Sequence, residues 1–195
     1  MKRTKLLVSA FLLLTVVFTF FGCAPKITVD EIKAELPQLI EPSKMLNEIY
    51  LGKGYPESKD VSAKEISGYY YCDTSLYGFN SISEIKDATE KIFTPEYANV
   101  LYQAAFDGLS TEQAVESARY IESDAGLMQK VNDDVYDLPS REFDYDSVEI
   151  VKGGRERVTI SIASKANGKN EVIEMIVVRY GEEGNYSYRL DSPTY

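Results

Sequence analysis

The sequence predicts an α+β fold in which N-terminal helices pack on a curved antiparallel β-sheet. The spacing of apolar residues changes near Arg119, from every three or four positions before it to every second position after it. Turn residues such as Asn167 and Gly168 separate the later segments, as expected of strands that follow one another in a meander. Of the 195 residues, 44% are hydrophobic and 27% are charged, a composition typical of a compact folded domain.

The N-terminal segment has the organisation of a secretory signal peptide. Three basic residues precede the largely apolar run 6–21. This run is shorter than the roughly 20 residues that cross a membrane as a helix. Its length and its basic flank are instead typical of the apolar core of an export signal.

The end of this run resembles the bacterial lipobox, in which cleavage exposes a cysteine that becomes diacylated. Gly22 and Cys23 match the pattern, which prefers Leu and a small residue where this chain has Phe20 and Phe21. We expect residues 1–22 to be a lipoprotein signal peptide, with palmitate-like acyl chains on Cys23 that bind the membrane. The expected location is the extracytoplasmic face of the cell membrane. An uncleaved anchor with an incidental cysteine is the alternative.

Residues 23–56 are expected to form a tether with two short helices. Thr28 and Glu31 have the spacing of a capping box, so the first helix begins there and ends before Pro37. The second begins after Pro42 and has an apolar stripe on one face. Short helices are marginally stable alone, so these two either dock onto the main domain or separate it from the membrane.

The α+β domain is expected over residues 57–195 and begins with an aromatic strand at 67–73. Ser81 is placed to cap a helix whose apolar residues recur at steps of three and four. Thr94, followed by Pro and Glu, predicts the start of a second helix. A third short helix is expected at 110–117.

Segments with a period of two predict the strands of the sheet. Gly153 and Gly154 predict a two-residue turn between two of them. Apolar residues on both faces of 171–180 predict a central strand that is packed on two sides. The strands are expected at 119–123, 127–131, 147–152, 155–164, 171–180 and 186–191.

The charge balance excludes several classes of function. The net charge is −10, and without the three N-terminal bases 18 bases oppose 31 acids, which gives −13. A chain this acidic lacks the basic surface that binds phosphate backbones, so nucleic acid is excluded as a partner. The sequence contains no histidine, which removes Ser-His and Cys-His catalysis and histidine-ligated metals.

Acidic residues concentrate in the region 116–149. This region is interpreted as a solvated surface, as a face that binds a basic partner, or as a source of oxygen ligands for calcium. The spacing lacks the glycine and the final glutamate of an EF-hand loop, so no metal is assigned. The candidate binding residues are Asp133, Asp134, Asp137, Asp144 and Asp146.

Tyrosine is abundant, with 15 Tyr and no Trp in the chain. Tyr69, Tyr70 and Tyr71 are candidate binding residues, because adjacent tyrosines can line a pocket or stack on a sugar. Packing within a strand and the core is the alternative, since tyrosine is a good strand former. Cys72 is interpreted as a small buried hydrophobe, because the chain has no histidine to activate a thiol.

Two short motifs carry a resemblance to a known fold family. The residues Ile-Phe-Thr-Pro-Glu-Tyr at 92–97, the long hairpins and Tyr-Arg-Leu-Asp at 188–191 resemble the cystatin-like, or nuclear-transport-factor-2-like, α+β cone. That family often has Trp where this chain has Tyr188. Over residues 45–195, an exported protein of this layout is similar to IseA-type inhibitors of cell-wall DL-endopeptidases and to uncharacterised Firmicutes lipoproteins. The resemblance implies a cone-shaped binding domain in the cell envelope.

These features predict a non-catalytic cell-surface lipoprotein with a binding domain, and the resemblance implies an inhibitor or modulator of a cell-wall hydrolase. The expected partners are the membrane, through the lipid anchor, and a cell-wall enzyme or another envelope protein. No enzyme activity and no cofactor are expected, since no nucleophile has an evident base. The alternative is a domain that binds a small ligand, or a weak Asp/Tyr enzyme, on the concave face of the sheet.

Overall fold

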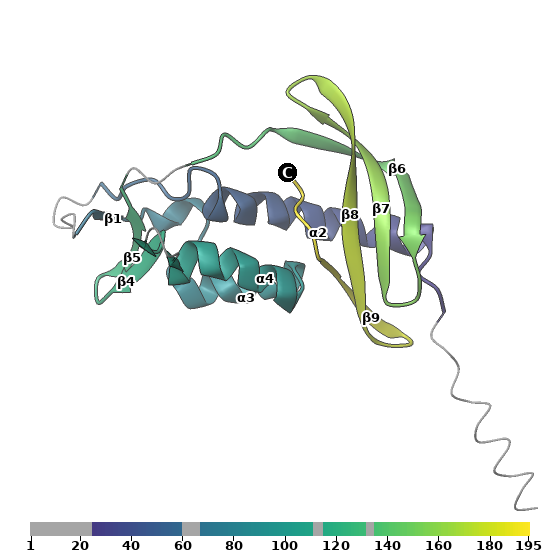
Figure 1. Cartoon of the computed structure of the whole chain (residues 1–195), viewed down its shortest axis with the longest axis horizontal. Helices are drawn as coiled ribbons and strands as arrows, with labels where there is room; N and C mark the ends of the chain where they lie inside the picture. Colours follow the sequence, from purple (N-terminus) through teal and green to yellow (C-terminus); the bar gives the residue numbers. More distant parts are fainter. Residues whose placement is uncertain (1–24, 60–66, 111–114, 132–134) are drawn as a thin grey trace, which may run out of the picture.

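The computed structural model describes residues 25–59, 67–110, 115–131 and 135–195. The architecture is α+β, which confirms the predicted fold class. Helix α2 (Val29–Tyr50) contacts a four-stranded antiparallel sheet at one end of the molecule, and a small three-stranded sheet lies at the other end (Figure 1). The molecule is therefore elongated, with α2 along its length.

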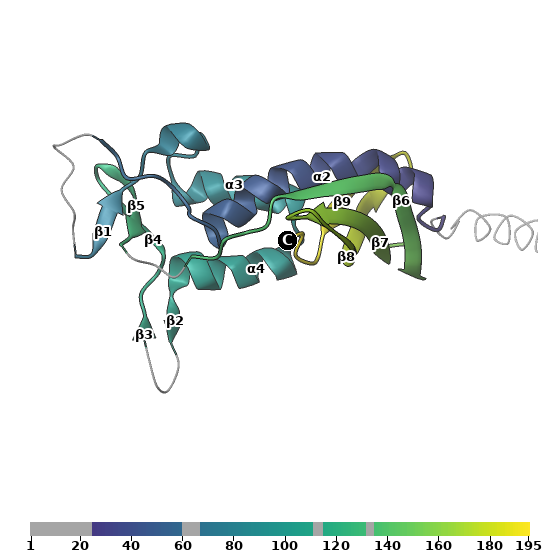
Figure 2. The same ribbon diagram turned by 90° about the horizontal axis from the view of Figure 1, so that it is seen from above.

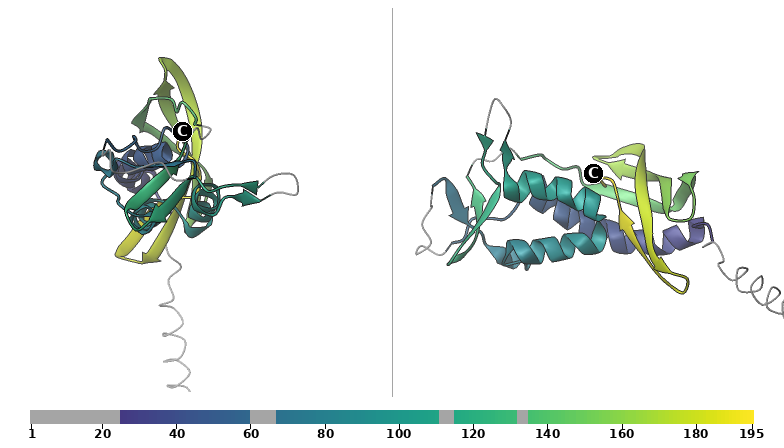
Figure 3. Two further views of the ribbon diagram at one scale, coloured as in Figure 1. Left: turned by 90° about the vertical axis from the view of Figure 1, so that its left-hand side faces the viewer. Right: turned by 60° about the horizontal axis from the view of Figure 1, so that its bottom comes forward.

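The large sheet has the strand order β6-β7-β8-β9, and the small sheet has the order β1-β5-β4. The short strands β2 and β3 pair only with each other and project from the side of the body (Figure 3). The strand bounds are β1 Tyr69–Tyr71, β2 Leu109–Ser110, β3 Val115–Glu116, β4 Tyr120–Ser123, β5 Gly126–Lys130, β6 Arg141–Gly153, β7 Arg157–Ala166, β8 Lys169–Glu182 and β9 Asn185–Leu190.

Helices α3 and α4 lie beside α2, between the two sheets (Figure 2). A short 3-10 helix precedes α3, and a π-helical turn continues α4. Their bounds are η1 Thr74–Leu76, α3 Ile82–Ile92, α4 Pro95–Tyr102 and η2 Gln103–Asp107. Within the described ranges no helix is both long enough and apolar enough to span a bilayer.

One long helix replaces the two short helices predicted for 23–56. α2 begins with the predicted capping box, and it then continues through Pro37 and Pro42. A proline inside a helix costs about 3 kcal/mol or more, whereas burying one large aliphatic side chain contributes about 1.5–3 kcal/mol. The predicted break at Pro37 is wrong because the buried face continues across both prolines. Its apolar members are Ile32, Leu36, Leu39, Ile40, Leu46 and Ile49.

The predicted starts of α3 and α4 are confirmed. Ser81 Oγ accepts a hydrogen bond from the Glu84 N–H at 3.1 Å, and Thr94 Oγ1 accepts one from the Tyr97 N–H at 3.2 Å. Each cap satisfies a backbone donor that the helix itself leaves unpaired. Both starts are local features, which is why the sequence alone locates them.

The third helix predicted at 110–117 is wrong. The chain leaves η2 through Gly108, whose φ of 74° ends the helical conformation. Leu109 and Ser110 are extended and pair with Glu116 and Val115 in the β2–β3 ladder. Residues 111–114 lie outside the described residues.

The predicted meander is confirmed, but one turn differs. Gly153 is the last residue of β6 and β7 begins at Arg157, so residues 154–156 form a three-residue loop in place of the predicted two-residue turn. The Gly154 N–H donates to the Arg157 carbonyl oxygen at 3.0 Å across this loop. A Cβ on Gly153 would overlap the backbone of Arg157 and Val158, so this position requires glycine for close approach of the strands.

β8 is an interior strand of the large sheet, but only one of its faces is buried. Met175 and Val177 are fully buried, whereas Ile176 and Val178 on the other face are only half-buried. The prediction of a strand packed on two sides is therefore wrong. The physical reason is that the buried face of the sheet is the one that shares a hydrophobic core with α2.

The last strand joins the large sheet to the α3–α4 junction. The Thr94 N–H donates to the Leu190 carbonyl oxygen at 2.9 Å, and the Thr94 hydroxyl donates to the Asp191 carboxylate. Phe93 forms a parallel bridge with Leu190. After β9, residues 191–195 form a C-terminal tail that returns to α2 (Figure 1).

Candidate functional site

A cavity of about 280 Å³ lies between α2, the segment before β6 and the C-terminal tail. We call it the tail pocket. Three segments that are far apart in the sequence line it: Lys44, Asn47 and Glu48 from α2, residues 138–141, and Thr194 and Tyr195 from the tail. Its lining includes the exposed residues Ser140 and Tyr195, so the pocket opens to solvent.

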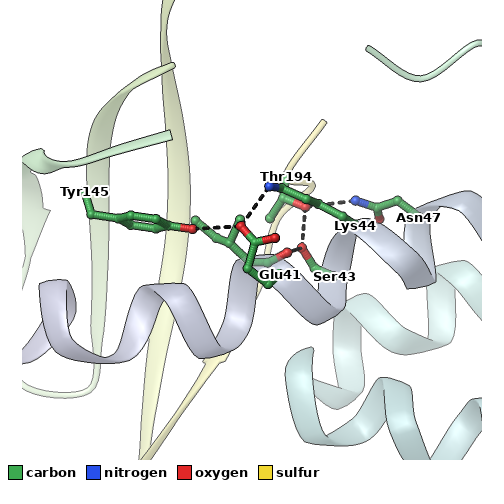
Figure 4. Close-up of polar contacts among 7 residues, drawn as sticks. Glu41, Ser43, Lys44, Asn47, Tyr145 and Thr194 are labelled. Atoms are coloured by element: carbon green, nitrogen blue, oxygen red, sulfur yellow. Dashed lines mark hydrogen bonds and ion pairs between the residues drawn. The ribbon is translucent and has the colours of Figure 1, made fainter. Parts of the chain in front are cut away.

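A directed chain of hydrogen bonds fixes one wall of the tail pocket (Figure 4). The Ser43 hydroxyl donates to the Ile40 carbonyl oxygen at 2.8 Å, and its oxygen lies 2.7 Å from Thr194 Oγ1. Because Ser43 has one proton, Thr194 donates to Ser43 and accepts from Asn47 Nδ2 at 2.9 Å. The side-chain amide of Asn47 is thereby oriented, with its Oδ1 left as an acceptor.

Two buried atoms of the lining residues have no hydrogen-bond partner in the described part of the chain. They are Asn47 Oδ1, an acceptor, and Arg141 Nε, a donor. Leaving a buried polar group unpaired costs about 1–3 kcal/mol. Both atoms are fully buried, so they lie behind the surface of the tail pocket.

Arg141 is held from one side only. Its Nη1 donates to Ser164 Oγ and to Glu171 Oε2, both at 2.8 Å, and its side chain is only 9% exposed. Nε belongs to the edge of the guanidinium that these two contacts leave open. That edge, formed by Nε and Nη2, is the one that binds a carboxylate with two parallel hydrogen bonds.

Lys44 is the second cation of the tail pocket. Its ammonium is 2.8 Å from Glu41 Oε1 and 5.4 Å from the centre of the Phe143 ring. The Tyr145 hydroxyl donates to the same Glu41 oxygen at 3.3 Å (Figure 4). Burial, reinforced by the Glu41 charge, raises the pKa of Tyr145 to about 12, so this hydroxyl remains a donor at neutral pH. These contacts hold the ammonium at the side of the pocket.

A second hollow of about 520 Å³ opens at the end of the large sheet, where Glu142, Asp144, Lys165 and Glu171 line it. Glu171 is already paired with Arg141. No side chain that lines this hollow carries a buried unpaired polar atom among the described residues. The tail pocket is therefore the better candidate for a polar ligand.

The three candidate tyrosines lie in β1, where each hydroxyl has a partner inside the protein. Tyr69 donates to the Ala118 carbonyl oxygen at 2.5 Å, Tyr70 donates to that of Tyr55 at 2.8 Å, and Tyr71 accepts from Ser123. None of the three lines the tail pocket or the open hollow. Their contacts hold the small sheet together.

The candidate acids do not come together in the described residues. Asp133 and Asp134 lie outside them, and Asp137 is exposed. Asp144 and Asp146 follow each other on the exposed face of β6. No three acidic or cysteine side chains gather as a metal site within the described ranges.

Asp144 has a structural role that its position in an acidic region does not reveal. The pairing of β6 with β7 is interrupted between residues 144 and 149. At this bulge Asp144 Oδ1 accepts from the Asp146 N–H at 3.1 Å, and the Ser147 hydroxyl donates to the Asp144 carbonyl oxygen at 2.6 Å. Ser147 Oγ also accepts from the Ala163 N–H at 2.8 Å. These contacts satisfy backbone groups that the broken ladder leaves unpaired.

Cys23 lies outside the described residues, while Cys72 is half-buried beside the small sheet. Burial raises the pKa of the Cys72 thiol to about 12, although the nearby Arg119 charge acts in the opposite direction. The thiol is therefore protonated at neutral pH and is a poor nucleophile.

The residues of the tail pocket were not among those predicted from the sequence. Ser43 and Asn47 are four positions apart on the buried face of α2, and polar residues at such positions indicate a buried hydrogen-bond network. Their partner Thr194 lies 147 residues beyond Asn47, which no local pattern reveals. In the comparisons with known proteins, no family model matches the chain, and neither a curated protein nor a solved structure matches it.

Proposed function

We propose that this chain is a lipid-anchored, non-catalytic binding domain at the extracytoplasmic face of the cell membrane. The observation that supports the anchoring is that residues only two to four positions after Cys23 already contact the folded domain. Arg179 Nη2 donates to the Pro25 carbonyl oxygen at 2.6 Å, and the Ile27 N–H donates to the Gly154 carbonyl oxygen at 3.2 Å. Acyl chains on Cys23 would therefore bring the β6–β7 loop next to the membrane surface with no spacer between them.

Inhibition of lipoprotein signal processing tests the anchor. Globomycin is expected to make the unprocessed precursor accumulate, and Cys23→Ala is expected to have the same effect without the drug. Cys72→Ala is the matched control, since Cys72 follows the predicted signal by many residues and its variant is processed normally. Unchanged processing of the wild type in globomycin would refute the lipid anchor.

The state of the candidate catalytic groups supports a non-catalytic role. The Cys72 thiol is protonated at neutral pH, and burial raises the pKa of the Tyr50 and Tyr120 hydroxyls as well. The acid of an acid/base pair needs a carboxyl whose pKa is raised by burial. None of the described Asp and Glu residues is among the buried residues.

The more specific proposal is that the domain inhibits or modulates a cell-wall hydrolase. It is supported by the resemblance to the IseA-type inhibitors and by one long helix lying on a four-strand meander, the layout expected of a cystatin-like or nuclear-transport-factor-2-like cone. The exposed acids Asp144 and Asp146 offer a basic partner a surface of opposite charge.

An inhibition assay tests this proposal directly. The purified chain is mixed with DL-endopeptidases and murein, and the release of peptide fragments is followed over time. Dose-dependent loss of hydrolysis is expected at micromolar excess of the chain. Undiminished hydrolysis at that excess would contradict the proposal.

Small-ligand binding is the second candidate function, and the tail pocket favours it. One wall of the pocket is fixed by the hydrogen bonds among Ser43, Thr194 and Asn47, and the polar side chains of Lys44 and Arg141 also line it. Native mass spectrometry of the detergent-purified chain tests this function. A small molecule that is retained by the wild type and lost in Arg141→Gln is expected. If the wild type and Arg141→Gln both show the mass of the protein without a bound molecule, small-ligand binding is contradicted.

A further inference from the structure

Two turns of the large sheet lie at the end where the chain enters the fold. The β6–β7 loop (154–156) and the β8–β9 turn (183–184) are at the same end, because successive strands of the sheet run in opposite directions. The Ile27 N–H donates to the Gly154 carbonyl oxygen at 3.2 Å, and α2 begins at this end of the molecule (Figure 1). An anchor in the N-terminal segment therefore holds this end of the sheet near the bilayer.

Three exposed basic side chains lie at the β6–β7 loop: Lys26, Lys152 and Arg155. Within the described part of the chain, none of the three takes part in an ion pair. Glu156 is the one acid of the loop, so three bases and one acid give this region a net charge of +2. The contrast with the rest of the chain is large, because residues 23–195 carry 18 bases against 31 acids.

A β-bulge places an apolar side chain next to these bases. The ladder between β6 and β7 shifts between Ile150 and Lys152, so Val151 is an extra residue between two ladder pairs. A bulge at a sheet edge re-aims a side chain, and Val151 is 55% exposed. Basic side chains attract anionic headgroups, and an apolar side chain beside them enters the boundary between headgroups and acyl chains. We call this group the basic surface; it consists of Lys26, Val151, Lys152 and Arg155.

The β8–β9 turn, at the same end of the sheet, has the opposite charge. Glu182 and Glu183 are both exposed there. An anionic bilayer attracts the basic surface and repels these two glutamates. Because such forces act over roughly 8 Å at physiological ionic strength, the charges nearest the anchor decide how the domain is oriented.

We propose that the basic surface binds the phosphate groups of anionic lipids beside the anchor. The domain is then tilted, with the β6–β7 loop against the bilayer and the β8–β9 turn away from it. α2 has 22 residues and is roughly 33 Å long, so it holds the small sheet away from the membrane. This inference rests on the proposed membrane anchoring, and it adds the lipid class and the surface of the fold that contacts it.

Hydrogen–deuterium exchange of the full chain, reconstituted in vesicles, tests the proposal. One set of vesicles contains phosphatidylcholine alone, and the other contains an equal mixture of phosphatidylcholine and the anionic phosphatidylglycerol. Each net positive charge near an anionic surface favours contact about fivefold, so amides of residues 151–157 are expected to exchange on the order of 10-fold more slowly in the anionic vesicles. Residues 182–185 are expected to exchange alike in both, and about 1 M salt is expected to abolish the difference at 151–157.

Variants locate the contact. Lys152→Gln/Arg155→Gln is expected to remove the difference between the two kinds of vesicle while the chain stays folded, since both side chains are exposed. Lys165→Gln/Lys169→Gln is the matched control. It removes two exposed bases at the opposite end of the same sheet, so it changes the net charge equally and is expected to behave as the wild type.

The outcomes separate this proposal from the anchoring on which it rests. Equal exchange of residues 151–157 in the two kinds of vesicle would overturn the basic surface, as would loss of the difference in the control variant. Equal slowing of residues 182–185 would overturn the tilt. Intact mass of the same sample shows whether Cys23 carries a lipid; a vesicle-bound chain without one refutes the lipid anchor, and its exchange still decides the basic surface. A chain that does not float with either kind of vesicle would overturn both.

Discussion

The hydrogen-bond chain from Asn47 to Ile40 gives a quantitative test of the wall of the tail pocket. Ser43→Ala removes the acceptor of the Thr194 hydroxyl, and both residues are at most 2% exposed, so water cannot replace it. Leaving one buried donor unpaired costs about 1–3 kcal/mol, so we expect the free energy of unfolding to fall by about 2 kcal/mol. For a chain of this size that corresponds to a fall in Tm of roughly 4–8 °C.

A double-mutant cycle isolates the contact between the two hydroxyls. Thr194→Val alone leaves the Asn47 Nδ2 donor without an acceptor and is also expected to cost about 2 kcal/mol. The Ser43→Ala/Thr194→Val variant is expected to be about 1 kcal/mol more stable than the sum of the single changes implies, because the first change already breaks the shared bond.

Urea unfolding monitored by circular dichroism measures these differences. The slope of the free energy of unfolding against urea concentration is expected to stay unchanged among the variants. Ser140→Ala is the matched control, since Ser140 is exposed on the same side of the molecule, and it is expected to change stability by less than about 0.5 kcal/mol. Two results would refute the hydrogen bond between Ser43 and the C-terminal tail: a Ser43→Ala variant as stable as Ser140→Ala, or a double variant whose loss of stability equals the sum of the two single losses.

Three further predictions follow from other parts of the fold. The hydrogen bond from the Thr28 N–H is the main cause that lowers the pKa of Glu31 below its usual 4.5. The capping box therefore stabilises the fold above pH 4.5, and this contribution is lost as the pH falls through the folded-state pKa. In urea unfolding between pH 7 and pH 3, the free energy of unfolding is expected to fall less in Glu31→Gln than in the wild type. With its pKa raised to about 12, Cys72 is expected to resist iodoacetamide at pH 8 and to react within minutes only after unfolding, and rapid native labelling would show that the thiol is accessible and ionised. Gly54 and Gly78 both have positive φ, but only at Gly54 would a Cβ overlap Gln129 and Tyr120. In thermal unfolding, Gly78→Ala is expected to lower the free energy of unfolding by about 1 kcal/mol, and Gly54→Ala by about 1–3 kcal/mol more. Equal losses in the two variants would contradict this packing.

Features that depend on neighbouring residues were predictable from the sequence. The caps of α3 and α4 depend on Ser81 and Thr94 and on donors three residues later, and the tight turn at Asn167 and Gly168 depends on two residues that tolerate positive φ. Each of these signals is complete within a few positions, so no knowledge of the tertiary structure was needed.

Features that depend on distant burial were not predictable in the same way. The break at Pro37 followed from helix propensity, which the buried face of α2 overrides. In the tail pocket Asn47 donates to Thr194, and Arg141 is a further lining residue, so three separate parts of the chain form the site. The sequence marks Ser43 and Asn47 as polar residues on an apolar face, but it does not indicate what they contact.

We propose that the fold begins immediately after a lipidated cysteine and works as a binding domain at the membrane surface. Intact-mass spectrometry of the protein, expressed from its full sequence in bacteria and extracted from the membrane fraction, tests this claim most directly. We expect a chain that begins at Cys23 and carries a diacylglyceryl group. A chain that retains Met1, or one that is recovered from the cytosol without a lipid, would contradict it.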